Sequence, residues 1–273
     1  MLELPESCNI AREVNENLTG KKIKGVVVEQ SPHRFAFFSE DKQNYEAMLR
    51  GQTIVAGCYH GGIVEIDTED YIVYFSDGAY PRYFEGNKEP KKHQLLISFE
   101  DGTSISVSVQ MYGYIGVCKK GQCSHEYYCS SSEKPDPLED KFTLDYFKGL
   151  YKPGKNKLTV KGFLATDQRI PGLGNGVLQD ILWRAGIDPR YDMKNIKEED
   201  FRSLYDSIRN TLREMVVAGG RNTEKDLLGN NGGYITHMCK DTLGTICPKC
   251  GGKIEKANYM GGTIYYCPGC QKR

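Results

Sequence analysis

The sequence predicts an α+β protein in three consecutive parts: a β-sandwich, a helical region and a small zinc module. Short β-branched or alternating runs, separated by turn residues, fill most of residues 1–130. Apolar residues at helical spacing characterise residues 138–220. Two Cys-x2-Cys pairs stand near the C-terminus. Together these observations indicate that strands, helices and a metal-bound module follow one another along the chain.

Length and composition restrict the class of protein. The chain has 273 residues, of which 39% are hydrophobic, and its formal net charge is zero. Zero net charge neither favours nor excludes nucleic acid, because only local clusters of charge matter for a phosphate backbone. No run approaches the roughly 18 apolar residues of a membrane span, and the acidic start lacks the features of a signal peptide. We therefore expect a cytoplasmic protein with no membrane partner and with reduced cysteines, whose clusters indicate metal rather than disulfides.

The first 130 residues are expected to be mainly strands. One helix is predicted near the start, at 9–18, because Ile10, Val14 and Leu18 share a helical face. Turn signals are found at 76–78, 86–87 and 100–102. The predicted strands are 24–29, 62–66, 71–75, 95–99 and 104–109.

Residues 130–137, which contain three serines and a Pro-Asp-Pro sequence, are expected to link this part to the helical one. Helices are predicted at 140–150, 176–185 and 198–217. In the last of these, five apolar residues form one stripe, which we interpret as core: Phe201, Leu204, Ile208, Leu212 and Met215. Residues 221–240 are polar and rich in glycine, as expected for a loop.

The C-terminal module is predicted to bind one structural zinc ion. Cys247 and Cys250 form the first Cys-x2-Cys pair, and Cys267 and Cys270 form the second after sixteen residues. Each pair places two thiolates on a tight turn, and two such turns complete a tetrahedron. Four thiolates leave no open position for water, so the metal is expected to be structural rather than catalytic.

A glycine-rich turn precedes the helix predicted at 176–185. Residues 171–175 read Pro-Gly-Leu-Gly-Asn. Such a turn lets backbone amides approach an anion closely, and a helix N-terminus attracts phosphate. The same residues also suit a turn that only caps a helix, so the pattern by itself leaves both interpretations open.

Several motifs, taken in order, resemble the formamidopyrimidine-DNA glycosylase / endonuclease VIII (Fpg/Nei) family of DNA-repair enzymes. They span nearly the whole chain. They comprise the Met-Leu-Glu-Leu-Pro-Glu start, the Pro-Asp-Pro-Leu linker at 135–138, the Gly-Leu-Gly-Asn turn at 172–175 with 181–189 after it, the Gly-Gly segment at 219–223, and the zinc-binding end at 265–271.

The resemblance implies a fold and an activity. The fold is an N-terminal β-sandwich, a helical domain with a helix–two-turns–helix element, and a zinc β-hairpin, with domains at 1–132, 133–239 and 240–273. The activity is that of a DNA glycosylase and AP lyase, acting as a monomer on double-stranded DNA with a damaged or abasic site, in the cytoplasm and near the nucleoid. In such enzymes the N-terminal amine attacks C1′ of the damaged nucleoside to form a Schiff base, and the target base is flipped out of the stack.

The same resemblance implies the site residues. The nucleophile would be the terminal amine, on Leu2 once Met1 is removed, and Glu3 would shuttle protons. The lesion-reading loop would lie around 227–233. The residues implied to contact DNA are Tyr112, Lys161, Gly172, Gly174 and Asn175.

The chain departs from the family at several working positions. Leu2 stands where the family has proline, and Gly62 and Gly262 stand where it has a hairpin lysine and a zinc-finger arginine. Asp77 takes the place of an apolar wedge, for which an acid is a poor substitute in a base stack. Two hypotheses follow: a divergent glycosylase/lyase that uses the terminal amine and Glu3, or a relative that binds damaged DNA without chemistry.

Two further features have no assigned role. His60 precedes the Gly61-Gly62 pair and is interpreted as a loop histidine, with an acid, base or phosphate-donor role as the alternative. Cys118, Cys123 and Cys129, with His125 nearby, have spacings that are unusual for a compact zinc site. A second metal there is the less favoured interpretation.

Overall fold

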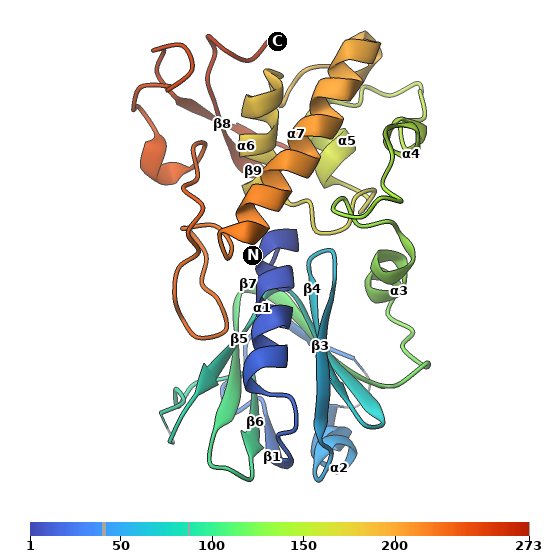
Figure 1. Cartoon of the computed structure of the whole chain (residues 1–273), viewed down its shortest axis with the longest axis vertical. Helices are drawn as coiled ribbons and strands as arrows, with labels where there is room; N and C mark the ends of the chain where they lie inside the picture. Colours follow the sequence, from blue (N-terminus) through green and yellow to red (C-terminus); the bar gives the residue numbers. More distant parts are fainter. Residues whose placement is uncertain (40–41, 87, 273) are drawn as a thin grey trace.

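The computed structural model describes residues 1–39, 42–86 and 88–272. The chain forms two lobes, shown in Figure 1: a sheet lobe built from the first half of the chain and a helical lobe that carries the C-terminal hairpin. The N-terminus lies where the two lobes meet. One apolar core belongs mainly to each lobe, the first centred on the strands and the second on the helices. This arrangement places the start of the chain between the two lobes.

Helix α1 (Leu4–Asn17) runs from this junction into the sheet lobe. It starts five residues before the predicted helix, because Pro5 occupies the first turn, where its missing N–H costs no hydrogen bond. Ile10 and Val14 are fully buried against the strands. Gly57 permits this approach, since a Cβ there would lie 2.5 Å from the carbonyl oxygen of Ala11.

Seven strands form one hydrogen-bonded sheet, ordered β1-β6-β7-β5-β4-β3, with β2 paired in parallel to β7. The other pairs are antiparallel. The strands are β1 (Ile23–Val28), β2 (Ala36–Phe38), β3 (Ile54–His60), β4 (Ile63–Thr68), β5 (Tyr71–Phe84), β6 (Leu95–Phe99) and β7 (Ser104–Lys119).

The long strands β5 and β7 divide the sheet into two halves. The turn predicted at 76–78 is wrong: β5 continues through it, with a shift of register between Asp77 and Ala79. Gly78 lies at this irregularity, where a Cβ would come within 1.9 Å of the Gln110 carbonyl oxygen. Side chains from both halves, such as Phe75 and Ile105, share a single core. The sheet therefore folds over on itself as a sandwich.

The helical lobe contains the longest helix, α7 (Glu198–Val217), at the predicted position, and its apolar stripe is largely core. The segment predicted as a linker is in part helical, because residues 130–132 lie in α3 (Glu126–Glu133). The remaining helices are α2 (Tyr45–Leu49), α4 (Leu144–Gly149), α5 (Val160–Ala165) and α6 (Asn175–Ala185), with short 3-10 helices at Lys42–Asn44, Met193–Asn195 and Lys240–Thr242. Helices α5 and α6 with the turns between them form a helix–turns–helix unit.

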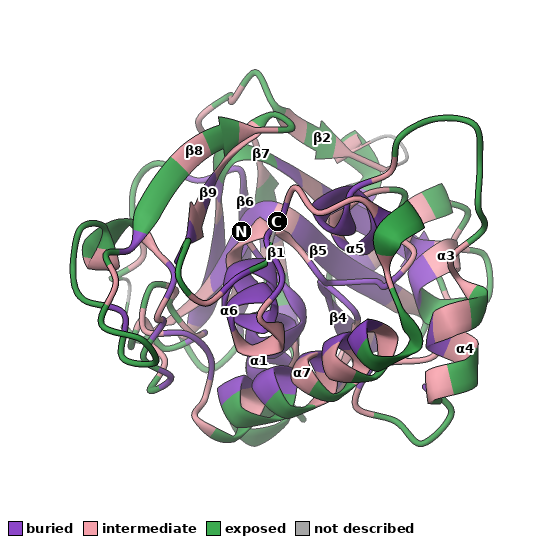
Figure 2. Cartoon of the chain, turned by 90° about the horizontal axis from the view of Figure 1, so that it is seen from above, coloured by how far each residue is buried: buried purple, intermediate pink, exposed green. Residues whose placement is uncertain are grey.

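The chain ends in a hairpin of β8 (Glu255–Tyr259) and β9 (Gly262–Tyr266). In the view from above, α6 is largely buried, whereas β8 and the outer face of α7 are exposed (Figure 2). The predicted α+β fold class, with its sandwich, helical lobe and cysteine-bearing hairpin, is confirmed. Among the described helices, none has both the length and the apolar character needed to cross a membrane.

One expectation about the cysteines is wrong. Cys118, at the end of β7, and Cys123 form a disulfide with a Cα–Cα distance of 5.3 Å. The turn after β7 brings them within the range that a bridge requires. Cys129 stays free, and its thiol donates to the Cys123 carbonyl oxygen at 3.2 Å. The three cysteines are therefore neighbours without being a set of three metal ligands.

Candidate functional site

A cavity of about 530 Å³ opens at the junction of the two lobes. Its walls come from the start of the chain, the β5 and β7 irregularities, the turn before α6, and the tip of the C-terminal hairpin. All seven residues that the sequence places in catalysis or DNA contact line it: Leu2, Glu3, Tyr112, Lys161, Gly172, Gly174 and Asn175. Residues distant in sequence therefore meet in one place.

Glu3 is the most enclosed carboxylate of the cavity, with 3% of its surface exposed. Its two oxygens accept hydrogen bonds from the backbone amides of Gly176, at 2.8 Å, and Val177, at 2.7 Å. These amides belong to the first turn of α6, whose dipole favours an anion. Burial nevertheless raises the pKa of Glu3 above its ordinary value, and a nearby guanidinium opposes the rise. Glu3 is held in one orientation by a helix from the other lobe.

The glycines of the turn leave the space that this contact needs. A Cβ on Gly174 would lie 2.5 Å from Oε1 of Glu3, and a Cβ on Gly176 would lie 1.7 Å from Nη1 of Arg221. Gly172 adopts φ +75° and packs against the backbone of Gly61. The turn is therefore a close-packing element for charged side chains, as well as the cap of α6.

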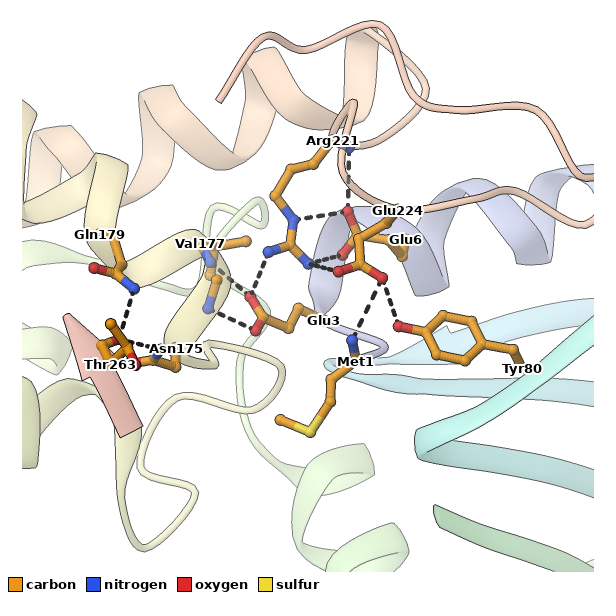
Figure 3. A network of polar contacts seen from close by, with 11 residues as sticks. Met1, Glu3, Glu6, Tyr80, Asn175, Val177, Gln179, Arg221, Glu224 and Thr263 are labelled. Carbon is orange, nitrogen blue, oxygen red and sulfur yellow. Dashed lines mark hydrogen bonds and ion pairs between the residues drawn. The ribbon is translucent and has the colours of Figure 1, made fainter. Parts of the chain in front are cut away.

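Arg221 was not identified from the sequence, although it follows the Gly-Gly pair at 219–220. It is 3% exposed. Its guanidinium donates to both oxygens of Glu6, at 3.0 and 2.7 Å, and Nη1 lies 3.4 Å from Oε2 of Glu3 (Figure 3). A basic residue in a polar loop is normally exposed to solvent, so this buried network becomes visible only in the folded structure.

The start of the chain borders the same network. The Met1 amine lies 3.4 Å from Oε2 of Glu224, which also accepts a hydrogen bond from the Tyr80 hydroxyl at 2.6 Å (Figure 3). The backbone N–H of Leu2 donates to the Asp77 carbonyl oxygen at 2.6 Å. The Leu2 side chain is buried in the core of the sheet lobe. An apolar side chain thus anchors the terminus beside the cavity.

Lys161 and Asn175 lie beside the hairpin tip. Lys161 is buried rather than solvated, and its Nζ donates to the Tyr259 carbonyl oxygen at 2.7 Å. Burial lowers the pKa of this lysine. Asn175 donates to the Thr263 carbonyl oxygen at 3.0 Å. A Cβ on Gly262 would lie 3.6 Å from Nζ of Lys161, so the lysine cation borders the position where the family has an arginine.

At Gly62, where the family has its hairpin lysine, there is little room for a long side chain. A Cβ on Gly62 would lie 3.1 Å from the Leu2 carbonyl oxygen and 3.2 Å from the Tyr127 hydroxyl, so the terminus and α3 occupy that space. The irregular middle of β7 presents two large side chains at the cavity mouth, Tyr112 and Met111. Met111 is 74% exposed with φ +63°, and its exposure was not expected from the sequence.

The cysteine cluster lies at the other end of α6. The four thiol sulfurs lie within 4.8 Å of one another. Trp183 of α6 donates its indole N–H to the Cys247 sulfur at 3.4 Å. Gln179, one turn nearer the start of α6, donates to the Thr263 carbonyl oxygen of β9 at 3.1 Å. Four cysteines so placed are the donor set of one structural zinc ion. The Trp183 and Gln179 contacts hold the cysteine-bearing hairpin along α6, whose opposite end binds Glu3.

His60 lies outside this cavity, at the end of β3. Its Nε2 is 3.3 Å from the Glu65 carboxylate, which also accepts from the Tyr128 hydroxyl at 2.6 Å. The Cys58 thiol of β3 and the Asp67 carboxylate of β4 lie within 4.8 Å of the Glu65 carboxylate. Contact with a buried carboxylate thus gives His60 a structural partner.

The fold and the site define a class of protein, the helix–two-turns–helix zinc proteins. Its features here are a β-sandwich, a helix–turns–helix lobe, a four-cysteine hairpin and a cavity built around the start of the chain. A family model described as the formamidopyrimidine-DNA glycosylase H2TH domain matches residues 134–226. This match, together with similarity along the whole chain, supports membership of the Fpg/Nei family.

Curated relatives are similar along the whole chain, and solved structures share its fold. A protein named formamidopyrimidine-DNA glycosylase from Streptococcus pneumoniae is 26% identical over 280 residues, covering 100% of both chains. One of the same name from Enterococcus faecalis is 29% identical over 282 residues, covering 100% of this chain and 98% of its own. A structure of Lactococcus lactis Fpg with DNA containing an abasic site superposes with a TM-score of 0.84 at 23% identity, covering 99% of this chain and 100% of the other.

Proposed function

We propose that this protein is a DNA glycosylase with AP lyase activity that acts as a monomer on double-stranded DNA with a damaged or abasic site, in the cytoplasm at the nucleoid. The observation that carries the proposal is the meeting of the terminal amine and the buried Glu3 in one cavity. Glycosylases of this class need a nucleophile and a proton-transfer group at one sugar. Both are held here by groups from the two lobes.

The reaction begins at C1′ of a nucleotide flipped into the cavity. The terminal amine forms a bond to C1′ as the glycosidic bond breaks, and the base leaves with a proton. Glu3 transfers protons to the sugar and to the leaving base. The amine loses a proton and the C1′–O4′ bond breaks as Glu3 protonates O4′, which opens the sugar and leaves a Schiff base at C1′. Removal of a proton from C2′ then expels the 3′ phosphate and cuts the strand. The amine acts from Leu2 after removal of Met1, or from Met1 itself.

The DNA backbone is held by the turn before α6 and by the hairpin tip. The amides of Gly172 and Gly174 and the second amide hydrogen of Asn175 are donors suited to a phosphate. Lys161 supplies a cation beside Gly262, which offsets the missing family arginine. Tyr112 and Met111, at the cavity mouth, are the apolar groups that can fill the stack after a base is flipped.

Borohydride reduction of a mixture with abasic duplex DNA tests the chemistry. We expect a covalent complex, and peptide mass spectrometry should locate it on the terminal amine. An N-terminal extension should abolish it. Binding of the same DNA without any trapped complex, also in a Leu2→Pro variant trimmed of Met1, would favour the second hypothesis, a relative that binds damaged DNA without chemistry. Trapping that survives a blocked terminus would instead identify an internal lysine as the nucleophile.

A further inference from the structure

We propose that Arg221 is a positioning residue of the reaction, which holds Glu3 as a carboxylate in a fixed orientation against the first turn of α6. The inference rests on the proposed function, because it concerns how Glu3 is prepared for proton transfer. Arg221 lies in the segment after α7, and its guanidinium reaches the first turn of α6 beside Glu3 (Figure 3).

The first observation is the way in which Arg221 is itself held. Glu6 binds Nε and Nη2 of the guanidinium in a bidentate pair and also accepts from the Arg221 backbone N–H at 3.2 Å. Both Glu6 and Arg221 are buried. A planar guanidinium fixed by one carboxylate has its remaining nitrogen in a defined direction. Here that nitrogen, Nη1, points at Glu3.

The second observation is the fit of the guanidinium over α6. The position of a Cβ on Gly176 is 1.7 Å from Nη1 and 3.0 Å from Oε1 of Glu3. The absence of a side chain at Gly176 is therefore what allows Arg221, Glu3 and the α6 amides to meet. Gly232 packs against the backbone of Gly220, because a Cβ on Gly232 would lie 2.2 Å from the Gly220 carbonyl oxygen. This contact fixes the segment that carries Arg221.

The contact between Arg221 and Glu3 changes the balance between the charged and neutral forms of Glu3. Burial favours the neutral form of Glu3, and the neighbouring Glu6 carboxylate does so as well. Arg221 and the two backbone amides act in the opposite direction. Without the guanidinium, two buried carboxylates would face each other with no cation between them. A proton-transfer group must cycle between both forms near the working pH, and Arg221 keeps the charged form accessible.

The pH dependence of base release tests this role. The substrate is duplex DNA carrying a formamidopyrimidine lesion, and the midpoint belonging to Glu3 is the one that Glu3→Gln removes. In Arg221→Ala we expect this midpoint at higher pH and the rate at neutral pH lower by about 10²-fold, as for a misplaced catalytic group. Added guanidinium ion should restore rate and midpoint, whereas urea, its neutral counterpart, should not. Arg221→Lys should fall between Arg221→Ala and the wild type.

Two further variants separate positioning from folding. Gly176→Ala keeps every charge and places a methyl group where Nη1 lies, so it should raise the midpoint without removing the arginine. Arg190→Ala is the matched control: it breaks an Arg–Asp pair of 2.8 and 2.6 Å outside the cavity and should leave the midpoint unchanged. If Arg221→Ala does not fold, Arg221→Lys and Gly176→Ala decide the question.

The inference is overturned if folded Arg221→Ala, or Gly176→Ala, keeps the wild-type midpoint. Its failure is distinguishable from failure of the proposed function. Trapping of abasic DNA by the wild-type protein tests the function alone. If no trapping or base release occurs, NMR titration of a ¹³C-labelled Glu3 carboxyl still reports whether Arg221 holds it ionised. An unchanged titration in the Arg221 variants would then contradict the proposal.

Discussion

Contacts from both lobes set the orientation and the pKa of the Glu3 carboxylate. Its side chain starts in the sheet lobe, and its oxygens are bound by the amides of α6 in the helical lobe. Burial raises its pKa, so the carboxyl group remains protonated to a higher pH than an exposed glutamate. The midpoint of base release that belongs to Glu3 is therefore expected above 4.5, the ordinary value.

Replacement of Glu3 by glutamine tests its role directly. Glutamine keeps the shape but cannot transfer a proton, so base release from a damaged duplex should fall by roughly 10²–10⁴-fold. Trapping on DNA that is already abasic should fall much less, because no base has to leave. Rates of both reactions on matched duplexes provide the measurement. Equal losses in the two assays would indicate that Glu3 is needed for structure rather than for proton transfer.

At the scale of elements, α6 connects the two chemical features of the protein. Its first turn binds Glu3, and its last turns bind the zinc hairpin through Gln179 and Trp183. The hairpin has only a small core, which includes Trp183, Met238 and Ile254. Its order therefore depends on the metal.

Removal of zinc should loosen the hairpin before the sandwich. Elemental analysis should find one zinc per chain. After chelation, hydrogen exchange should increase in β8 and β9, while β5 and β7 remain protected, because they share the large apolar core. Protein purified without chelator that contains no metal would contradict the assignment, and so would a hairpin that stays protected after chelation.

The same scale shows what the sequence can predict. Helix α7 and the zinc ligands follow from local spacing, since an apolar stripe and paired Cys-x2-Cys turns are determined by neighbours in sequence. The continuation of β5 through 76–78 and the disulfide depend on partners across the sheet and at the end of β7. Arg221 looks like a solvated loop residue until residues 3 and 6 are placed beside it. Glu3 was singled out by the family resemblance rather than by spacing, whereas the glycine-rich turn itself pointed to Asn175.

For the molecule as a whole, the segment after α7 joins the lobes. Leu227 is fully buried in the core of the sheet lobe. Its backbone N–H donates to Glu13 at 2.8 Å, and its carbonyl oxygen accepts from Tyr83 at 2.8 Å. A few residues earlier, the same segment carries Arg221. The anchoring of Leu227 in the sheet lobe thus helps to hold Arg221 in the cavity.

Leu227→Ala should lower the free energy of unfolding by about 2–5 kcal/mol, the usual cost of truncating a buried leucine. Urea unfolding is the measurement. Leu228→Ala is the control, because Leu228 is 47% exposed and its truncation should change stability by no more than about 0.5 kcal/mol. If both variants unfold at the same urea concentration as the wild type, the segment does not fasten the lobes together.

The long separation along the chain between Glu3 and its partners has a consequence during synthesis. At about 5–20 residues per second, Arg221 leaves the ribosome roughly ten to forty seconds after Glu3. Until then the first residues lack the guanidinium, and they stay accessible to the enzymes that trim or acetylate new chains. Trimming or acetylation in this interval would set the state of the reactive end before Arg221 reaches Glu3.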